Sequence, residues 1–337
     1  MPEVFHFGNA WLDKKCNELA IPSVIVPGHR FYKSIRTIPI FALSFCRFLK
    51  KRNINMLHSH LYGSITGACL SAFSGNIPHI GTLHDNYTIE EKKIRIYSLL
   101  LAAFLGARLV AVSEKMRELL ETSGKFPKRR LQTILNGVDL RKFDRPIKRE
   151  LAYELRLNSN DIILICVGRL VDIKGHDILI EAFSRLKSEK QLKLLIVGDG
   201  PNMDHIRALV SQKGLIDNIK LLGLRDDVPS LLKLSDCFVL SSHSEGLSCS
   251  IIEAMASGLP AIATNVGGNF ELIEDGKSGY LVPPNDPNVL AQRIQVLIDD
   301  EERRKDFGEL SLRLAREKFS LQKMVTQYVE IYRTMIG

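Results

Sequence analysis

Short apolar runs alternate with segments of helical periodicity along the second half of the chain. Residues 162–168 and 192–197 are continuous apolar runs, which predict parallel strands buried on both faces. Between them, from about residue 177, apolar residues recur every three or four positions, as in an amphipathic helix. The alternation continues with strands predicted at 219–222, 237–240 and 260–264 and helices at 202–213, 228–234 and 250–256. This pattern predicts a doubly wound parallel sheet.

The first half repeats this alternation more weakly. Strands are predicted at 23–26, 55–58, 79–83, 109–112 and 132–135, with helical stretches between several of them. Charges and Pro146 interrupt the periodicity at 139–148, which we interpret as a linker, and residues 286–335 indicate consecutive helices. We therefore expect an α/β fold of two Rossmann-like doubly wound domains facing a central cleft, at residues 1–145 and 146–337.

The start of the chain departs from that pattern. A doubly wound domain normally opens with a strand and a Gly-rich turn, whereas residues 1–8 show only a short apolar run at 4–7 and the single Gly8. We predict that the N-terminal domain lacks its first strand–turn–helix unit.

Length and composition narrow the class of protein. A chain of 337 residues exceeds the ~250–300 residues at which one core stops growing. With 45% hydrophobic and 25% charged residues it cannot be disordered. Six cysteines without a C-x-x-C pair predict reduced thiols in a cytoplasmic protein. We expect neither a signal peptide nor a membrane span.

The net charge of +8 is unevenly distributed. Residues 1–150 carry 24 Lys and Arg against 12 Asp and Glu, whereas residues 151–337 carry 22 against 26. The first half could therefore meet an anionic membrane surface, or it could be an ordinary solvated basic face. No nucleic-acid-binding motif is present, so we expect no nucleic acid partner. The basic clusters lie at 50–52, 92–95 and 128–130.

A pair of carboxylates flanks the start of a predicted helix. Glu245 lies in the loop after a predicted strand, and Glu253 lies eight residues later. Between them Gly246, Leu247 and Ser248 bring backbone amides to the helix N-terminus, which can receive a phosphate. Hydroxyl groups on either side of that phosphate could then bind the carboxylates, as in a sugar nucleotide. Each glutamate alone could also be a solvated surface charge.

Two cations follow the first strand of the same domain. Arg169 offers a planar guanidinium and Lys174 a compact ammonium, and both come directly after the predicted strand at 162–168. Together they could neutralise a diphosphate leaving group.

With these motifs the sequence resembles the retaining glycosyltransferases of glycosyltransferase family 4, which have a GT-B fold. The resemblance covers about residues 55–337. It rests on HSH at 58–60, HD at 84–85, AVSE at 111–114, NGVD at 136–139, GRL-x3-KG at 168–175, GDGP at 198–201, LGLRDDV at 222–228, E-x7-E at 245–253, ASGLPAIATNVGG at 256–268 and DGKSGYLVPPND at 275–286.

The resemblance implies a role for each matching residue. Arg169 and Lys174 would hold the pyrophosphate of the donor, Glu253 the ribose hydroxyls, and Glu245 the hydroxyls of the donor sugar. His84 would lie close to the transferred sugar. The backbone at Gly223, Leu224 and Arg225 would recognise the nucleobase. His84, Glu245, Arg169 and Lys174 are therefore the expected catalytic residues. For His58 and His60, packing at a strand end is the simpler interpretation.

The resemblance also implies a reaction that needs no metal and no cofactor. The sequence contains no D-x-D pair, so fixed cations and helix amides would take the part of a divalent ion. The expected partners are a nucleotide-sugar donor, a saccharide or lipid-linked acceptor and an anionic membrane surface. We expect a cytoplasmic enzyme of cell-surface polysaccharide or glycolipid synthesis, peripheral to the inner face of the membrane. The alternatives are a catalytically weak sugar-nucleotide-binding protein and a GT-B epimerase or hydrolase.

Overall fold

The second half of the chain folds around one parallel six-stranded sheet. The computed structural model describes residues 1–28, 37–86, 94–124, 126–144 and 149–336. The strand order is β12-β11-β10-β7-β8-β9. The strands are β7 (Ile162–Val167), β8 (Leu192–Val197), β9 (Ile219–Gly223), β10 (Cys237–Leu240), β11 (Ala261–Thr264) and β12 (Gly279–Val282). This is the doubly wound order, and it reverses direction between β7 and β10.

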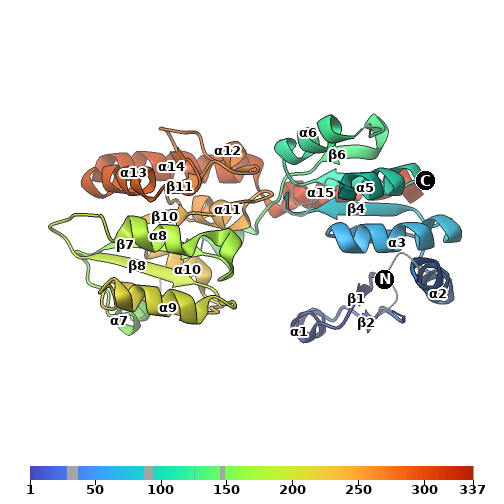
Figure 1. The fold of residues 1–337 in the computed structure, drawn as a ribbon, viewed down its shortest axis with the longest axis horizontal. Coiled ribbons are helices and arrows are strands. Elements are labelled where there is room, and N and C mark those ends of the chain that lie inside the picture. Colours follow the sequence, from blue (N-terminus) through green and yellow to red (C-terminus); the bar gives the residue numbers. More distant parts are fainter. Residues whose placement is uncertain (29–36, 87–93, 125, 145–148, 337) are drawn as a thin grey trace.

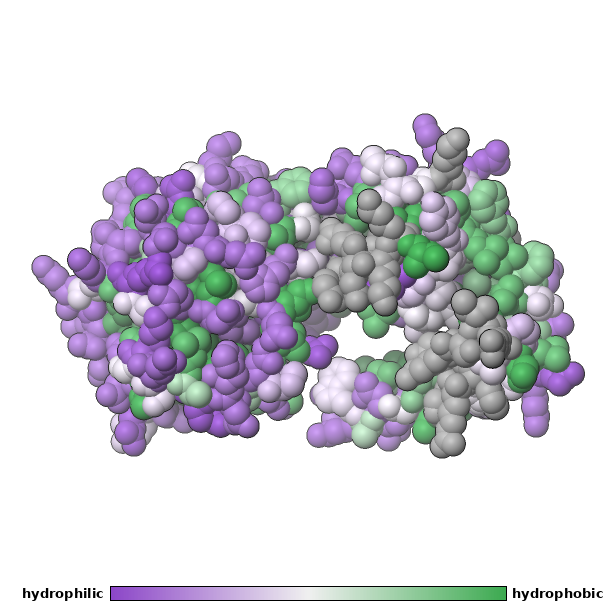
Figure 2. All heavy atoms as spheres, in the orientation of Figure 1, coloured by the Kyte–Doolittle hydropathy of each residue, from purple (hydrophilic) through white to green (hydrophobic). Residues whose placement is uncertain are grey.

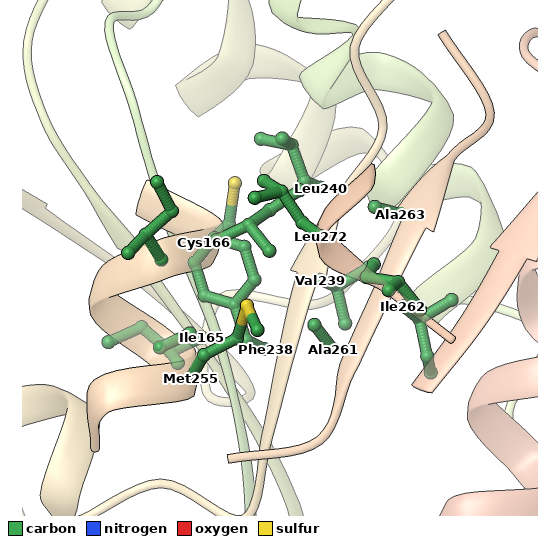
Figure 3. Close-up of a cluster of buried hydrophobic side chains, with 14 of the residues drawn as sticks. Ile165, Cys166, Phe238, Val239, Leu240, Met255, Ala261, Ile262, Ala263 and Leu272 are labelled. Atoms are coloured by element: carbon green, nitrogen blue, oxygen red, sulfur yellow. The ribbon is translucent and has the colours of Figure 1, made fainter. Parts of the chain in front are cut away.

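Helices cover both faces of this sheet (Figure 1). They are α7 (Arg149–Glu154), α8 (His176–Phe183), α9 (Met203–Gln212), α10 (Val228–Lys233), α11 (Cys249–Ala256), α12 (Asn269–Leu272), α13 (Pro287–Asp299) and α14 (Glu301–Lys318). Figure 3 shows the apolar core, in which Phe238 of β10 and Met255 of α11 lie beside Ile165 of β7. All three side chains are fully buried. The near-continuous apolar strands recognised in the sequence are explained by this two-sided burial.

The first half contains a smaller parallel sheet, in the order β3-β4-β5-β6. Its strands are β3 (Leu57–His60), β4 (His79–Leu83), β5 (Arg108–Ala111) and β6 (Leu131–Thr133). The helices of this half are α1 (Ala10–Glu18), α2 (Ile38–Lys51), α3 (Tyr62–Gly75), α5 (Ile94–Phe104) and α6 (Glu114–Ser123). Strands β1 (Val4–His6) and β2 (Ser23–Ile25) pair with each other in a separate sheet. In Figure 2 the two halves meet over the upper part of the view, and the gap below is bordered underneath by the part of the chain that holds β1, α1 and β2.

The last helix returns to the first sheet. Helix α15 (Leu321–Ile336) extends from the end of α14 to lie beside β4 and α5 of the first half (Figure 1). Its Tyr332 hydroxyl bonds the His58 ring, and its Thr334 hydroxyl accepts a hydrogen bond from Arg108. The expected division at residue 145/146 falls outside the described residues and stays a prediction. That division assigns α15 to the second domain, whereas α15 contacts the first.

The predicted parallel α/β fold is confirmed, and the strands predicted at 79–83, 192–197 and 237–240 have these bounds in the structure. Several elements were missed in the sequence, among them helix α1, which follows β1 and Gly8. Strand β12 and helix α12 are only four residues long and helix α7 only six, so none shows a clear period. Among the described residues, no helix has the length and apolar character that crossing a membrane requires.

Candidate active site

The candidate residues of the second domain lie where the strand order reverses. Strands β7 and β10 are neighbours in the sheet, and their carboxyl ends lead into the loops that carry Arg169 and Glu245. Open α/β sheets bind ligands in the crevice at this point. The topology therefore brings together two loops that are more than seventy residues apart in the sequence.

Gly198 lets the loops after three neighbouring strands lie close together. Gly198, after β8, has φ +139°, and a Cβ there would lie 1.9 Å from the carbonyl oxygen of Gly168. Its N–H donates to the carbonyl of Gly223, at the end of β9. The Gly-Asp-Gly-Pro segment recognised in the sequence thus joins the carboxyl ends of three strands, and only glycine fits at residue 198.

Lys174 and Glu245 form a largely buried ion pair. Nζ of Lys174 donates to Oε1 of Glu245 at 2.6 Å, and the Ser242 hydroxyl donates to the same oxygen at 2.6 Å. The side chains of Lys174 and Glu245 are 22% and 9% exposed. Gly175 makes this approach possible, because a Cβ there would lie 2.3 Å from the carbonyl oxygen of Ser241.

Helix α11 begins beside this ion pair. Ser248 is its N-cap, and the Ser248 hydroxyl accepts a hydrogen bond from the N–H of Ile251. The side chain of Leu247 is buried in the core, which anchors the preceding loop. The N-terminus of a helix carries free N–H groups and a partial positive charge, so it can bind an anion.

Glu253 and Arg169 have no side-chain partner among the described residues. Burial raises the pKa of the Glu253 carboxyl, and the more distant Lys142 opposes that shift. The Arg169 guanidinium is exposed. A half-buried carboxylate and an exposed guanidinium without partners are both available for a ligand.

Arg225 differs from these two residues. Its guanidinium donates to both carboxylate oxygens of Asp227, at 2.8 and 2.7 Å, and to Glu154 at 3.0 Å. Hydrogen bonds to these two carboxylates raise its pKa further. Its side chain is therefore engaged within the protein, while Leu224 beside it is 78% exposed and Gly223 has φ +65°.

His84 follows β4 in the first domain and faces the loop of Glu245. A Cβ on Gly246 would lie 2.1 Å from the carbonyl oxygen of His84, so the two main chains are in contact. The His84 ring is bonded through Nε2 to Nδ1 of His60 at 2.9 Å. Burial lowers the pKa of His84, and Asp85 opposes this shift.

Further contacts join the two domains around this site. The Asn136 amide donates to the carbonyl of Leu247, and a Cβ on Gly268 would lie 2.7 Å from the Ser113 side chain. The Glu271 carboxylate accepts hydrogen bonds from the N–H groups of Glu114 and Lys115, the first residues of α6.

The sequence did not reveal two of these relationships. Glu271 lies three residues after Gly268 and looks like an ordinary surface charge, because its partner helix α6 is distant in the sequence. The bond between His60 and His84 could have been suspected only from the HSH and HD motifs at two neighbouring strand ends. No group of three or more His, Cys, Asp or Glu side chains suited to a metal ion occurs in the part of the chain that is described.

Two family models match consecutive parts of the chain. The model "Glycosyltransferase Family 4" matches residues 3–142, and "Glycosyl transferases group 1" matches residues 148–311. A glycosyltransferase of Methanocaldococcus jannaschii, MJ1178, is 31% identical over 295 residues, which are 85% of this chain and 77% of that protein. The chain belongs to glycosyltransferase family 4. The predicted family is thereby confirmed.

Other relatives carry more specific names. The N-acetyl-alpha-D-glucosaminyl L-malate synthase of Bacillus anthracis is 34% identical over 206 residues, 61% of this chain. The match spans only about half of that relative's length, 54%. Relatives at 29–30% identity are a galactosyltransferase of Escherichia coli that acts on a diphosphoundecaprenol-linked sugar and a capsular polysaccharide glycosyltransferase of Staphylococcus aureus.

Solved structures of other glycosyltransferases have the same fold. Anabaena Alr3699/HepE, in complex with UDP and glucose, superposes with a TM-score of 0.86 at 21% identity, covering 98% of this chain and 91% of that one. At this identity the likeness concerns the fold alone. It confirms the predicted GT-B architecture of two Rossmann-like domains.

Proposed function

We propose that the chain is a retaining glycosyltransferase that moves a sugar from a nucleotide-sugar donor to a saccharide or lipid-linked acceptor. The bond between the anomeric carbon and the diphosphate breaks, and a bond from that carbon to an acceptor oxygen forms. The acceptor proton passes to the departing nucleoside diphosphate. One observation carries the proposal: Lys174, Glu245 and the N-terminus of α11 converge where the strand order reverses.

Cations and helix amides would hold the donor diphosphate. Lys174 already lies beside the helix N-terminus, and the Arg169 guanidinium has no competing partner in the described chain. On donor binding Lys174 would share its charge between Glu245 and a phosphate oxygen. The amides of Gly246, Leu247 and Ser248 would supply further donors to the same anion. This set of donors needs no divalent ion, so we propose that the reaction is metal-independent.

The two glutamates would bind hydroxyl groups on either side of the diphosphate. Glu253 would accept hydrogen bonds from the ribose, because its carboxyl is half-buried and has no protein partner in the described residues. Glu245 would accept them from the donor sugar through Oε2, since Oε1 already receives two bonds. A neutral sugar offers no charge for an ion pair. Carboxylates that accept hydrogen bonds from its hydroxyl groups would therefore bind it in one orientation.

The remaining proposed contacts come from two other loops. His84 would lie beside the transferred sugar, because its main chain contacts Gly246 next to Glu245. The main chain of Gly223, Leu224 and Arg225 would recognise the nucleobase. The Arg225 side chain would act indirectly there, by fixing the loop through Asp227 and Glu154. Residues 1–145 would carry the acceptor side, and residues 146–337 would bind the donor, with α15 supporting the first domain.

The acceptor side would meet an anionic membrane surface from the cytoplasm. Helix α5 exposes an apolar stripe, with exposed fractions of 73% for Ile94, 69% for Tyr97, 52% for Leu101 and 69% for Phe104. Figure 2 shows hydrophobic residues gathered over the end of α5 and the neighbouring end of α3, where Phe73 is exposed. This stripe lies in the half with the excess of basic residues. An apolar stripe with nearby cations suits a peripheral enzyme of polysaccharide or glycolipid synthesis.

The test is a donor panel. The purified protein is incubated with UDP-, GDP- and ADP-linked sugars and with lipid-diphosphate-linked and free saccharide acceptors, in the presence of EDTA. Proton NMR of the product then reports the anomeric configuration. We expect transfer with retention from one donor class and no loss with EDTA. Inversion, or a requirement for magnesium or manganese, would contradict the proposal.

A further inference from the structure

Three histidines share one face of the first sheet where β3 and β4 end. Side chains two positions apart in a strand point to the same face, so His58 and His60 of β3 lie together. The register pairs His60 with Thr82 of β4, and His84 follows two residues after Thr82. Helix α15 covers this face, because Tyr332 bonds His58.

His60 and His84 share one proton across a hydrogen bond. Nδ1 of His60 and Nε2 of His84 are 2.9 Å apart, so one of these nitrogens must carry hydrogen and the other must be bare. Neither ring has a second hydrogen-bond partner among the described residues. The two rings must therefore adopt complementary tautomers, and protonation of both facing nitrogens would break the bond.

Both rings of this pair are neutral at neutral pH. Desolvation beside the neighbouring rings lowers the pKa of His60 to about 4, and His84 adds to the effect, although part of the His60 side chain is exposed. The His84 pKa is also lowered by burial, although the adjacent Asp85 carboxylate opposes it. The other groups that face the cluster are uncharged: His58 and His79 are held neutral by burial, and burial raises the pKa of Tyr328 and Tyr332.

The His60 ring stacks on a ring that is hydrogen-bonded through both of its nitrogens. This second ring is that of His58, with centroids 4.3 Å apart and planes at 28°. Nδ1 of His58 bonds the Tyr332 hydroxyl at 2.7 Å, and Nε2 bonds the Thr82 hydroxyl at 2.8 Å. Since both nitrogens of His58 are bonded, the stack holds the plane of the His60 ring, and the hydrogen bond to His84 sets which ring edge carries Nδ1 on that side.

We propose that His60 is a positioning residue for His84: the hydrogen bond from its Nδ1 fixes the His84 ring in its orientation beside the donor sugar and couples the tautomers of the two rings. Helix α15 takes part in this through Tyr332 and His58. The inference rests on the proposed function, because it concerns the histidine that we place at the transferred sugar. It assigns His60 a role beyond packing at a strand end.

The first measurement does not depend on activity. Nitrogen-15 NMR of the histidine rings reports which nitrogens carry hydrogen. In the unaltered protein we expect complementary tautomers of the two rings and a coupling across the hydrogen bond between Nδ1 of His60 and Nε2 of His84. In His60→Phe, which keeps a stacked ring and removes the hydrogen bond, we expect that coupling to be lost and the tautomer ratio of His84 to change. His60→Asn places an amide near the position of Nδ1, which can donate to or accept from Nε2 of His84, so it should restore a hydrogen bond to the His84 ring. The same Phe substitution at His205, exposed on α9, is the control.

The second measurement is the steady-state rate. We expect His60→Phe to lower kcat by about 10- to 100-fold, the scale for a misplaced reacting group, with the donor KM within about threefold. His60→Asn should recover most of this rate. In a His84→Ala background His60→Phe should add almost nothing, because the residue through which it acts is gone.

The outcomes separate the two hypotheses. An unchanged His84 tautomer in His60→Phe, or an equal rate loss with and without His84, overturns the positioning role. A changed tautomer in a protein that transfers sugar from no donor supports the pairing and contradicts the proposed reaction. A changed tautomer with the expected rate loss supports both.

Discussion

Gly246 lies against the main chain of His84 with no room for a side chain between them. A Cβ at Gly246 would lie 2.1 Å from the carbonyl oxygen of His84, which is shorter than any van der Waals contact between a carbon and an oxygen atom. This contact joins the loop that leads into α11 to the loop that follows β4. This contact fixes the position of one domain against the other at the point where we place the donor sugar.

Gly246→Ala should separate the two loops. We expect the donor kcat/KM to fall by about tenfold or more, because overpacking of this kind costs about 1–3 kcal/mol and displaces His84 from the donor loop. Steady-state kinetics and thermal unfolding measure the two effects. Gly63→Ala is the control, since a Cβ there meets nothing within 4 Å and its position in α3 favours alanine. Unchanged kinetics in Gly246→Ala would show that the contact has no part in turnover.

Arg169→Ala and Lys174→Ala should both weaken binding of a nucleoside diphosphate, by about 1.5–3 kcal/mol each, the scale of a charge-assisted hydrogen bond. The two variants should differ in their free energy of unfolding. Lys174→Ala leaves the Glu245 carboxylate buried without its cation and should lower the free energy of unfolding by about 3 kcal/mol. Arg169 is exposed and unpaired in the described chain, so its removal should leave stability unchanged.

Calorimetry with UDP and GDP, together with urea unfolding, tests this pair of variants. If both variants bind the nucleotides as tightly as the unaltered protein, the cations do not hold the diphosphate. The double variant Lys174→Ala with Glu245→Gln should regain much of the stability, because the buried carboxylate is then neutral.

Glu253→Gln should stabilise the unliganded protein while weakening nucleotide binding. Burial raises the pKa of Glu253, so the folded state favours the protonated form, and ionisation costs stability as pH rises through the raised pKa. At pH 7 the amide avoids this cost and should raise the free energy of unfolding by about 1 kcal/mol. The difference between variant and unaltered protein should vanish below about pH 4, where the carboxyl is protonated in both states.

Urea unfolding at pH 4 and pH 7 measures this difference, and UDP or GDP calorimetry measures binding. Glu245→Gln is the matched variant: we expect it to leave nucleotide affinity nearly unchanged and to lower turnover of the whole donor. Equal losses of nucleotide affinity in both variants would contradict the division of roles between ribose and sugar.

The histidine face should make the protein sensitive to acid. Burial lowers the pKa of His58 from 6.5 to about 3, so the folded state holds it neutral. Its contribution to stability is complete above the ordinary pKa and is lost as pH falls toward the folded value. The free energy of unfolding should therefore fall between about pH 6 and pH 4, with His58 alone contributing about 1.4 kcal/mol per pH unit.

Urea unfolding at several pH values tests this slope. His58→Gln should be less stable at pH 7, because the bonds to Tyr332 and Thr82 are disturbed, but should show a shallower pH dependence. His205→Gln on the surface of α9 should keep the original slope. A slope that is the same in all three proteins would mean that His58 titrates normally.

The sequence predicted what depends on local pattern. Strands such as β8 and β10 are nearly continuous apolar runs, and such runs predict strands that are buried on both faces. The loop after β10 could be recognised because Glu245, Ser248 and Glu253 have a fixed spacing around one helix start. The doubly wound order then brought Arg169 and Lys174 to the same edge.

Local sequence patterns could not predict the contacts between segments that are distant in the chain. Helix α15 follows α14 in the chain, and nothing in its apolar period tells which sheet it covers. Its Tyr328 and Tyr332 are recognised as partners of Thr82 and His58 only once the fold is known. The carboxylate of Glu271 likewise meets the N-terminus of α6 through tertiary structure alone.

The last prediction concerns the apolar stripe of α5. Ile94, Tyr97, Leu101 and Phe104 recur at helical spacing and are all more than half exposed, which is costly in water unless another surface covers them. An anionic bilayer would cover the stripe, and each basic residue near it would add roughly 1 kcal/mol of attraction within a Debye length of ~8–10 Å. We expect binding to phosphatidylglycerol vesicles, release at about 0.5 M salt, and little binding to neutral vesicles.

Co-sedimentation of variants with vesicles distinguishes the contribution of the apolar stripe from that of the basic residues. Replacing Tyr97, Leu101 and Phe104 by Ser should abolish binding at any salt concentration, because the buried apolar area is lost. Charge reversal of Lys92, Lys93 and Arg95 should weaken binding most at low salt. Ile216→Ser and reversal of Lys187, Lys190 and Lys193 in the second domain should have no effect, because these residues lie outside the basic half. If the second-domain variants are the ones that fail to bind, or if no vesicle is bound at all, the acceptor is soluble and the stripe has another occupant.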